Sequence, residues 1–503
     1  MSVPSKKVYQ DLKPGHFILG IILSAISGIL LLLSFPPYGI WPLIWIAFFP
    51  YVIAQHRLFS RRWESLSFSI ALLFWLGPYL ARIFGDEAGF FFKYLGVWIA
   101  IITFFLHKER TFHELTQYRW FILQGIISWV GFEMIRTFIP LLATNAFIGY
   151  TQAKQAWLIQ PVSIFSIYGL NLVIMLVNFS LAYWVIAWFD HRWPMKDIVI
   201  FNHYSAKRWL GITVGIVLFW IGLSFFILFS APEDTPTIRV AALQSNFPQA
   251  AHVDSETPPE QRFQVLTEQI HEAAEQGAEV IFTPEMGLAF DPQVEHTEEL
   301  KDLAAETGAY LFITYVVSNE NEFRNEAVVM SPSGEFLEVY GKNHAFGEPR
   351  TPTAGVYPVY ETPVGRLATM ICHDANYTDV ARKLTHNGAQ VIATATREFG
   401  GVGEQLWTNN VFRAVENRVA VVYNGVAFSS AIIDPYGRLL ALKLNPDGER
   451  LTLVRDVPLG EGNTLLVQWG DWLGWLSLAG YIFFIAFQLI VERKAGSMKK
   501  QIT

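Results

Sequence analysis

Long apolar segments restrict this chain to the folds available to a membrane protein. Hydrophobic residues make up 52% of its 503 residues and charged residues only 16%, a composition too apolar for a soluble protein of this size. Eight segments are long enough to cross the roughly 30 Å hydrocarbon layer of a bilayer. They lie near Phe17–Ser34, Tyr38–Ala54, Leu66–Phe84, Phe90–Leu106, Trp120–Ile139, Val162–Phe189, Leu210–Phe229 and Trp472–Val491. We therefore predict a polytopic α-helical membrane bundle with about eight spans.

Lys and Arg are unevenly distributed over the connections between these segments. They gather at the N-terminus, after the second, fourth and sixth segments, and in the C-terminal tail, whereas the alternate connections carry few. Connections rich in Lys and Arg stay on the cytoplasmic side of a membrane. The pattern predicts that both termini are cytoplasmic and that residues 231–468, which follow seven crossings, are extracytoplasmic.

Residues 231–468 have the composition of a soluble domain, with many Asp and Glu. A Pro-rich stretch, Ala231–Pro236, separates them from the preceding apolar segments. Short β-rich runs alternate with amphipathic helices such as Gln261–Glu275, which predicts an α/β sandwich. We expect a membrane domain with about seven helices over 1–230, an α/β domain over 231–468, and a last transmembrane helix with a cytoplasmic tail over 469–503.

Three chemically active side chains follow predicted strands in the α/β domain. Glu285 follows one apolar run, Lys342 follows a second, and Cys372, the only cysteine of the chain, ends a third. Each has an ordinary interpretation when taken alone. A strand-end cysteine is usually a packed core residue, a Pro-Glu pair usually begins a loop, and a lysine in a turn is usually solvated. Together, in this order, they favour a catalytic trio.

Short motifs in both parts of the chain are those of one family. In the membrane part they include Phe35-Pro36-Pro37, Trp129 with Glu133 and Arg136, and Gly149-Tyr150-Thr151-Gln152. In the α/β domain they are Val240–Asn246, Pro284-Glu285, Tyr340 with Lys342 and His344, Phe346-Gly347-Glu348, Ile371-Cys372, Arg413 with Glu416, and then Gly470-Asp471. In these motifs and in its order of spans, domain and final span, the chain resembles the apolipoprotein N-acyltransferases, the membrane-embedded branch of the nitrilase superfamily.

The resemblance implies a nitrilase-like αββα sandwich and a role for each member of the trio. A free thiol has a pKa of about 8.5 and needs a neighbouring base, which would be Glu285. Lys342, with the backbone N–H after Cys372, would stabilise the oxyanion. The implied reaction is a ping-pong acyl transfer in the bacterial inner membrane. A phospholipid would give its fatty acyl group to Cys372 as a thioester, and the N-terminal amine of a diacylglyceryl-cysteine on an apolipoprotein would accept it.

Four further residues are candidates for supporting roles, namely Glu348, His373, Asp374 and Glu416. The chain departs from the family near the site. Cys372-His373-Asp374 stands where the family has Cys-Tyr-Glu, and Thr396-Arg397-Glu398-Phe399 stands where an aromatic segment is common. We expect these departures to shift the preferred donor or acceptor and to leave the acyl-enzyme step intact.

Other functions are disfavoured or remain as alternatives. A net charge of −7 without a basic stripe argues against a nucleic-acid partner. No metal-ligand spacing or phosphate-binding Gly-rich loop is present in the sequence, so we expect no metal and no cofactor. A membrane-tethered amidase acting on a small amide or nitrile would use the same trio, and a relative that only binds lipids would not need it. Glu133 and Arg136 would either pair structurally or contact a lipid headgroup.

Overall fold

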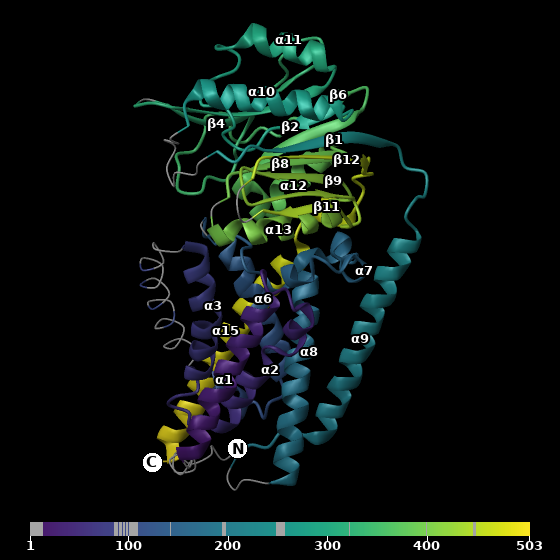
Figure 1. The fold of residues 1–503 in the computed structure, drawn as a ribbon. Coiled ribbons are helices and arrows are strands. Elements are labelled where there is room, and N and C mark those ends of the chain that lie inside the picture. The colour runs from purple at the N-terminus through teal and green to yellow at the C-terminus, as the bar shows by residue number, and fades with distance from the viewer. Residues whose placement is uncertain are drawn as a thin grey trace.

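A helical bundle forms one end of the molecule and an α/β domain forms the other (Figure 1). Besides single positions between 85 and 108, the computed structural model describes residues 14–84, 109–140, 142–193, 198–247, 257–320, 322–398, 400–445 and 449–502. The last helix returns from the α/β domain into the bundle and ends near the start of the first helix. The two ends of the described chain therefore lie on the side of the bundle opposite the α/β domain.

The bundle is built from apolar helices of unequal length. The longer ones are α1 (Pro14–Ser34), α3 (Leu66–Phe84), α6 (Phe121–Arg136), α8 (Val162–Arg192), α9 (His203–Phe229) and α15 (Trp472–Ile502). Four of them, α1, α8, α9 and α15, are long and apolar enough to cross a membrane by length and composition. Shorter helices join them, namely α5 (Glu109–Leu115), η5 (Ile148–Gln152) and α7 (Ala156–Ile159).

Glycines allow these helices to approach one another closely. A Cβ on Gly28 of α1 would lie 2.4 Å from the carbonyl oxygen of Ala71 on α3. A Cβ on Gly131 of α6 would lie 2.7 Å from the carbonyl oxygen of Ser477 on α15. Helices in lipid associate largely through such packing, because no hydrophobic driving force acts between them.

Two of the predicted spans need comment. The segment Tyr38–Ala54 is not one continuous helix, and its crossing of the membrane stays a prediction. It is divided into η2 (Trp41–Ile46), α2 (Phe49–Ile53) and the π-helical turn η3 (Ala54–Leu58), and a proline stands at the beginning of each of the first two. Proline removes a backbone donor and clashes with the preceding turn, so it begins helices and interrupts them. The predicted span Phe90–Leu106 lies outside the described residues, apart from isolated positions.

The α/β domain is a sandwich of two six-stranded sheets. The first has, in order, β12 (Leu451–Pro458), β1 (Thr237–Gln244), β2 (Val280–Phe282), β3 (Tyr310–Ser318), β4 (Phe323–Met330) and β5 (Tyr340–Gly341). The second has β11 (Leu439–Leu444), β10 (Ser429–Ile433), β9 (Ala420–Gly425), β8 (Val391–Thr396), β7 (Gly365–Ile371) and β6 (Tyr360–Thr362). The expected sandwich is confirmed, with two sheets.

Helices cover the outer face of each sheet (Figure 1). They are α10 (Pro259–Glu275) and α11 (Thr297–Thr307) on the first sheet, and α12 (Thr378–His386) and α13 (Gly403–Asn417) on the second. Alternate residues of a strand point to opposite faces. In β2, Ile281 packs into the core under α10, whereas Val280 and Phe282 pack into the core between the sheets. A three-residue strand thus connects two cores.

The α12–α13 layer faces the bundle, and one contact there explains a break in α8. Ser166 has φ 58° and ψ 173° inside that helix. The backbone N–H of Ile167 donates to Glu416 Oε1 on α13 at 3.0 Å, and Ser166 Oγ donates to Asp471 Oδ1 at 2.6 Å. The polar groups at the break are therefore satisfied by side chains of the α/β domain and of the segment before α15 (Trp472–Ile502).

Arg418, directly after α13, is a second link between the domain and the bundle. Its buried guanidinium donates from Nη1 to Gln160 Oε1 at 2.6 Å and to the Pro435 carbonyl at 3.1 Å. Nη2 donates to Ser163 Oγ at 3.3 Å. Gln160 lies just before α8 and Ser163 lies in its first turn. The guanidinium of Arg418 therefore hydrogen-bonds the start of this helix to the domain.

We expect Arg418→Lys to destabilise the protein by about 1.5–3 kcal/mol, the value of charge-assisted hydrogen bonds that a single ammonium cannot replace in this geometry. The measurement is thermal unfolding in detergent. Arg438→Lys is the matched control, because Arg438 is exposed and lies 3.7 Å from Asp434. Its effect should stay within about 0.5 kcal/mol. Equal losses in the two variants would contradict the role given to Arg418.

Candidate active site

The structure brings the three predicted residues together at strand ends from both sheets. Glu285 follows β2 and Lys342 follows β5 of the first sheet, and Cys372 follows β7 of the second. Lys342 Nζ lies 2.9 Å from Glu285 Oε1. Cys372 lies near enough to Glu285 that, besides burial, the negative charge of the carboxylate raises the pKa of the thiol. Residues 87 positions apart in the sequence thus form one cluster.

Glu285 is held as an ionised carboxylate. Its side chain is only 2% exposed. Asn325 Nδ2 donates to Oε1 at 2.8 Å, and the backbone N–H of Arg397 donates to Oε2 at 2.6 Å. Burial alone would raise the pKa of Glu285, but the Lys342 ammonium and the donors from Asn325 and Arg397 outweigh it and lower the pKa below its ordinary value.

Cys372 occupies a tight turn between β7 and the 3₁₀ turn η6 (Cys372–Asn376), with φ 51°. The residue is neither fully buried nor fully exposed. Burial and the negative charge of Glu285 raise the pKa of the Cys372 thiol well above its ordinary value, although Lys342 opposes this. The resting pair is therefore a protonated thiol beside an ionised carboxylate, which is the arrangement that general-base catalysis requires.

Lys342 keeps its proton although it is buried. Burial would lower its pKa, but the negative charges of Glu285 and Glu348 raise it above its ordinary value. Glu348 Oε1 lies 2.5 Å from Lys342 Nζ, and its Oε2 accepts the backbone N–H of Phe346 at 3.0 Å. Of the four candidate supporting residues, Glu348 is thus the one in direct contact with the trio's lysine.

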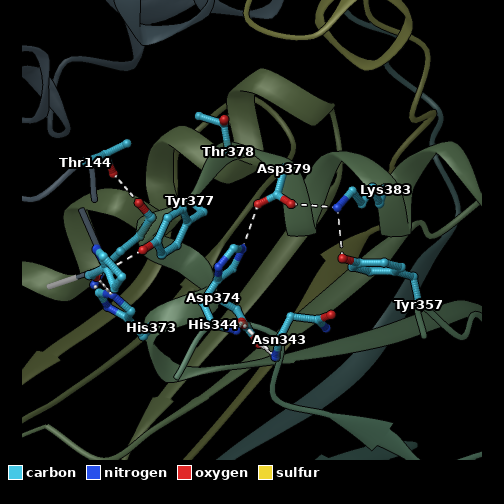
Figure 2. A network of polar contacts seen from close by, with 12 residues as sticks. Thr144, Asn343, His344, Tyr357, His373, Asp374, Tyr377, Thr378, Asp379 and Lys383 are labelled. Carbon is cyan, nitrogen blue, oxygen red and sulfur yellow. Dashed lines mark hydrogen bonds and ion pairs between the residues drawn. The ribbon is translucent and has the colours of Figure 1, made fainter. Parts of the chain in front are cut away.

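Asp374 joins the loop that carries Lys342 to the turn that carries Cys372 (Figure 2). Its buried carboxylate accepts the backbone N–H groups of His344 at 2.7 Å, Asn343 at 3.1 Å and Ile371 at 3.1 Å. It also accepts the Tyr340 hydroxyl at 2.6 Å. The carboxylate therefore links the segments that carry Lys342 and Cys372, without touching either side chain.

His373 connects the cysteine turn to the bundle. Burial lowers the pKa of His373 to about 4, so its imidazole is neutral. Its Nε2 donates to the Pro140 carbonyl, in the loop after α6, at 2.6 Å, and Nδ1 accepts from Asn376 Nδ2 at 2.9 Å. Thr144 of the same loop donates to the Asn376 carbonyl at 2.6 Å. The residue after the nucleophile is thus anchored in the membrane part.

The fourth candidate, Glu416, lies elsewhere. It is fully buried against Arg413, at 2.7 Å, and accepts the N–H of Ile167 from α8. Burial raises the pKa of Glu416 to about 7. Its contacts hold the domain on the bundle, so a supporting role beside Cys372 does not follow from its position.

Sequence patterns did not single out Asn325, which holds Glu285. It lies on β4, and only the pairing of β4 beside β3 and β2 brings its amide to that carboxylate.

The sequence patterns also did not single out a second polar network. His344 Nε2 lies 3.0 Å from Asp379 Oδ1, and Asp379 pairs with Lys383 at 2.7 Å (Figure 2). The i,i+4 spacing of Asp379 and Lys383 on α12 was the available signal.

Arg397 and Glu398, the departures from the family pattern, have different positions. Arg397 is half-buried and its Nη1 contacts Met286 Sδ at 3.4 Å. Glu398 is completely buried and faces the turn at 425–429. The expected effect of these residues on substrate preference stays a prediction.

Among the residues that the structure describes, no group of three His, Cys, Asp or Glu is arranged to hold a metal ion.

Two family models match the chain in succession. The model for the apolipoprotein N-acyltransferase N-terminal domain matches residues 27–180, and the carbon-nitrogen hydrolase model matches residues 239–464. A solved amidase from Nesterenkonia sp. matches 44% of this chain and 90% of its own, with 24% identity and a TM-score of 0.36.

Relatives align along nearly the whole length. An apolipoprotein N-acyltransferase of Geobacter metallireducens is 26% identical over 91% of this chain and 93% of its own. One of Thermotoga maritima is 23% identical over 96% of both chains. A nitrilase of Pyrococcus abyssi is 29% identical, but over only 31% of this chain. With both family models in this order and relatives that align from end to end, the chain belongs to the apolipoprotein N-acyltransferases, a membrane-embedded branch of the nitrilase superfamily.

Proposed function

We propose that this protein moves a fatty acyl group from a membrane phospholipid to the N-terminal amine of a diacylglyceryl-cysteine on an apolipoprotein. The observation that carries the proposal is the buried pair of Glu285 and Lys342, with Nζ 2.9 Å from Oε1, beside Cys372. Lys342 lowers the pKa of Glu285, and burial and Glu285 raise that of the thiol, which gives a base beside a protonated nucleophile. This cluster belongs to a domain anchored on an apolar bundle, and the apolipoprotein N-acyltransferases that match the chain cover both parts.

The first half-reaction forms the acyl-enzyme. Glu285 takes the proton of Cys372 as the sulfur attacks the ester carbonyl of the phospholipid. The developing oxyanion is stabilised by Lys342 and by the backbone N–H after Cys372. When the tetrahedral intermediate collapses, the ester C–O bond breaks, and protonated Glu285 returns its proton to the departing lysophospholipid oxygen. A thioester on Cys372 and an ionised Glu285 remain.

The second half-reaction consumes the thioester. The amine of the acceptor attacks the thioester carbonyl while Glu285 takes one of its protons. The C–S bond then breaks, the proton passes to the sulfur of Cys372, and an amide leaves. Both half-reactions use the same base and the same oxyanion site, so one trio is sufficient for the ping-pong sequence.

Anchoring of the site in the bundle supports lipid substrates over a small soluble amide. The turn after Cys372 is tied through His373 and Asn376 to the loop that follows α6. A donor and an acceptor confined to the bilayer would therefore reach a site whose position relative to the membrane is set. A tethered amidase would need one span and no such contact.

Acylation of Cys372 is the first prediction from this mechanism. Incubation with phospholipid and without acceptor should leave one acyl group on the protein, labile to hydroxylamine and located by mass spectrometry. Cys372→Ser should fold but lose turnover, because a hydroxyl is much harder to ionise than a thiol. An adduct on another residue, or near-normal turnover of Cys372→Ser, would overturn the mechanism.

Loss of either charged partner should slow the same step. Lys342→Ala should reduce the single-turnover rate by about 100- to 1000-fold, the usual effect of removing an oxyanion donor. Glu285→Gln should also slow it, since the amide keeps the shape but accepts no proton. Lys301→Ala is the control, because Lys301 is exposed and pairs only with Glu298 on α11 among the described residues. Unchanged rates in the two site variants would contradict the assigned roles.

The orientation proposed for the membrane puts the α/β domain outside the cytoplasm and both termini inside. A periplasmic reporter inserted in an exposed loop of the domain should be active, and the same reporter fused after Lys500 should be inactive. A cytoplasmic reporter should give the opposite pattern at the two positions. Cytoplasmic signal from the domain would invert the topology.

A further inference from the structure

Glu398 is a buried carboxylate that the mechanism above does not use. It follows β8, and its side chain has no solvent exposure. The residue before it, Arg397, supplies the backbone N–H that donates to Glu285 Oε2 at 2.6 Å. Asn325 and Lys342 both donate to the other oxygen, Oε1. The hydrogen bond to Oε2 therefore depends on where the chain places residue 397.

Three backbone N–H groups hold the Glu398 carboxylate. Oε1 accepts from Phe428 and from Ser429 at 2.8 Å each, and Oε2 accepts from Val426 at 2.9 Å. Val426 and Phe428 lie in the turn between β9 and β10, and Ser429 is the first residue of β10. A carboxylate with three such donors is fixed in orientation, so the position of Arg397, the residue before it, is fixed as well.

Two glycines leave room for this carboxylate. A Cβ on Gly425 would lie 1.8 Å from Glu398 Oε1, and a Cβ on Gly403 would lie 2.7 Å from Glu398 Cγ. The pocket around the side chain is thus closely fitted. Burial raises the pKa of Glu398 to about 7, despite the three N–H donors.

We propose that Glu398 is a positioning residue for the general base. By anchoring its own segment to the turn at 425–429, it keeps the Arg397 N–H directed at Glu285 Oε2 and so helps to keep Glu285 ionised. It touches neither substrate nor sulfur, and it acts through the peptide group of its neighbour. The inference rests on the Glu285–Cys372 pair of the proposed function and not on the identity of the acyl donor or acceptor.

Alkylation of Cys372 by iodoacetamide tests this without any lipid reaction. Cys372 is the only cysteine, so the full-length protein in detergent reports on one thiol. Its alkylation rate should fall at acid pH as Glu285 becomes protonated and ceases to accept the thiol proton. The charged groups that face this pair are Lys342 and Glu348. Tyr423 and His373 are titratable neighbours, and His373, with a pKa of about 4, is present unchanged in every variant compared.

Glu398→Gln should move the acid limb of that profile to higher pH by about one unit, which is the effect of weakening one hydrogen bond to an ionised carboxylate. At the pH of the acid limb Glu398 is protonated, but both of its oxygens still offer an acceptor lone pair. The N–H₂ of Gln offers none to the N–H donors of the turn, so the segment should shift. Asp434→Asn is the matched control. Asp434 is also a buried carboxylate that accepts two backbone N–H groups, from Tyr436 and Arg438, and its variant should leave the acid limb in place.

Gly425→Ala provides a second variant, in case Glu398→Gln fails to fold. It retains the Glu398 carboxyl group but forces it out of its pocket, and it should cause a shift of the same sign. A folded Glu398→Gln or Gly425→Ala whose acid limb coincides with that of the unmodified protein would overturn the proposal. Loss of acyl transfer with an unshifted alkylation profile would also count against it, since that result indicates a purely structural role.

If acyl transfer to a lipopeptide proves absent in the unmodified protein, the proposed function fails while the alkylation result still decides the role of Glu398.

Discussion

The buried ion pair between Glu285 and Lys342 is the interaction on which the site depends. Two charges removed from water are costly unless each is compensated by close partners. Here Asn325 and the Arg397 N–H complete the environment of the carboxylate, and Glu348 completes that of the ammonium. Because the pair is satisfied, Glu285 stays ionised and the adjacent thiol stays protonated. In the proposed mechanism the proton moves when a substrate carbonyl meets the sulfur.

The same principle of satisfied buried polar groups joins the two halves of the molecule. Glu416 accepts an N–H at the break in α8, Arg418 fastens the start of that helix, and His373 ties the nucleophile turn to the loop after α6. These contacts make the membrane part and the α/β domain one framework. Acyl transfer between two lipid-anchored molecules benefits from such a framework, since misplacement by an ångström is costly in rate.

Local pattern was sufficient for much of this architecture. Apolar length predicted α1, α8, α9 and α15, and alternating runs predicted the sandwich. Apolar length did not predict the break in Tyr38–Ala54, where prolines divide an apolar segment into short helical pieces. Hydropathy measures the affinity of a segment for lipid and does not register the backbone donors that proline removes.

The sequence by itself determined that the chain is largely apolar, that an α/β domain lies between spans, and that Glu285, Lys342 and Cys372 each follow a strand. These properties depend on composition and on neighbours in the chain. Tertiary structure alone decided that Asn325 donates to the Glu285 carboxylate and that Glu416 accepts an N–H of α8. It also decided that the backbone N–H of Arg397, 112 positions away, donates to Glu285. The physical reason is that burial, charge and hydrogen bonding at these sites arise between strands and helices distant in sequence, so no local pattern records them.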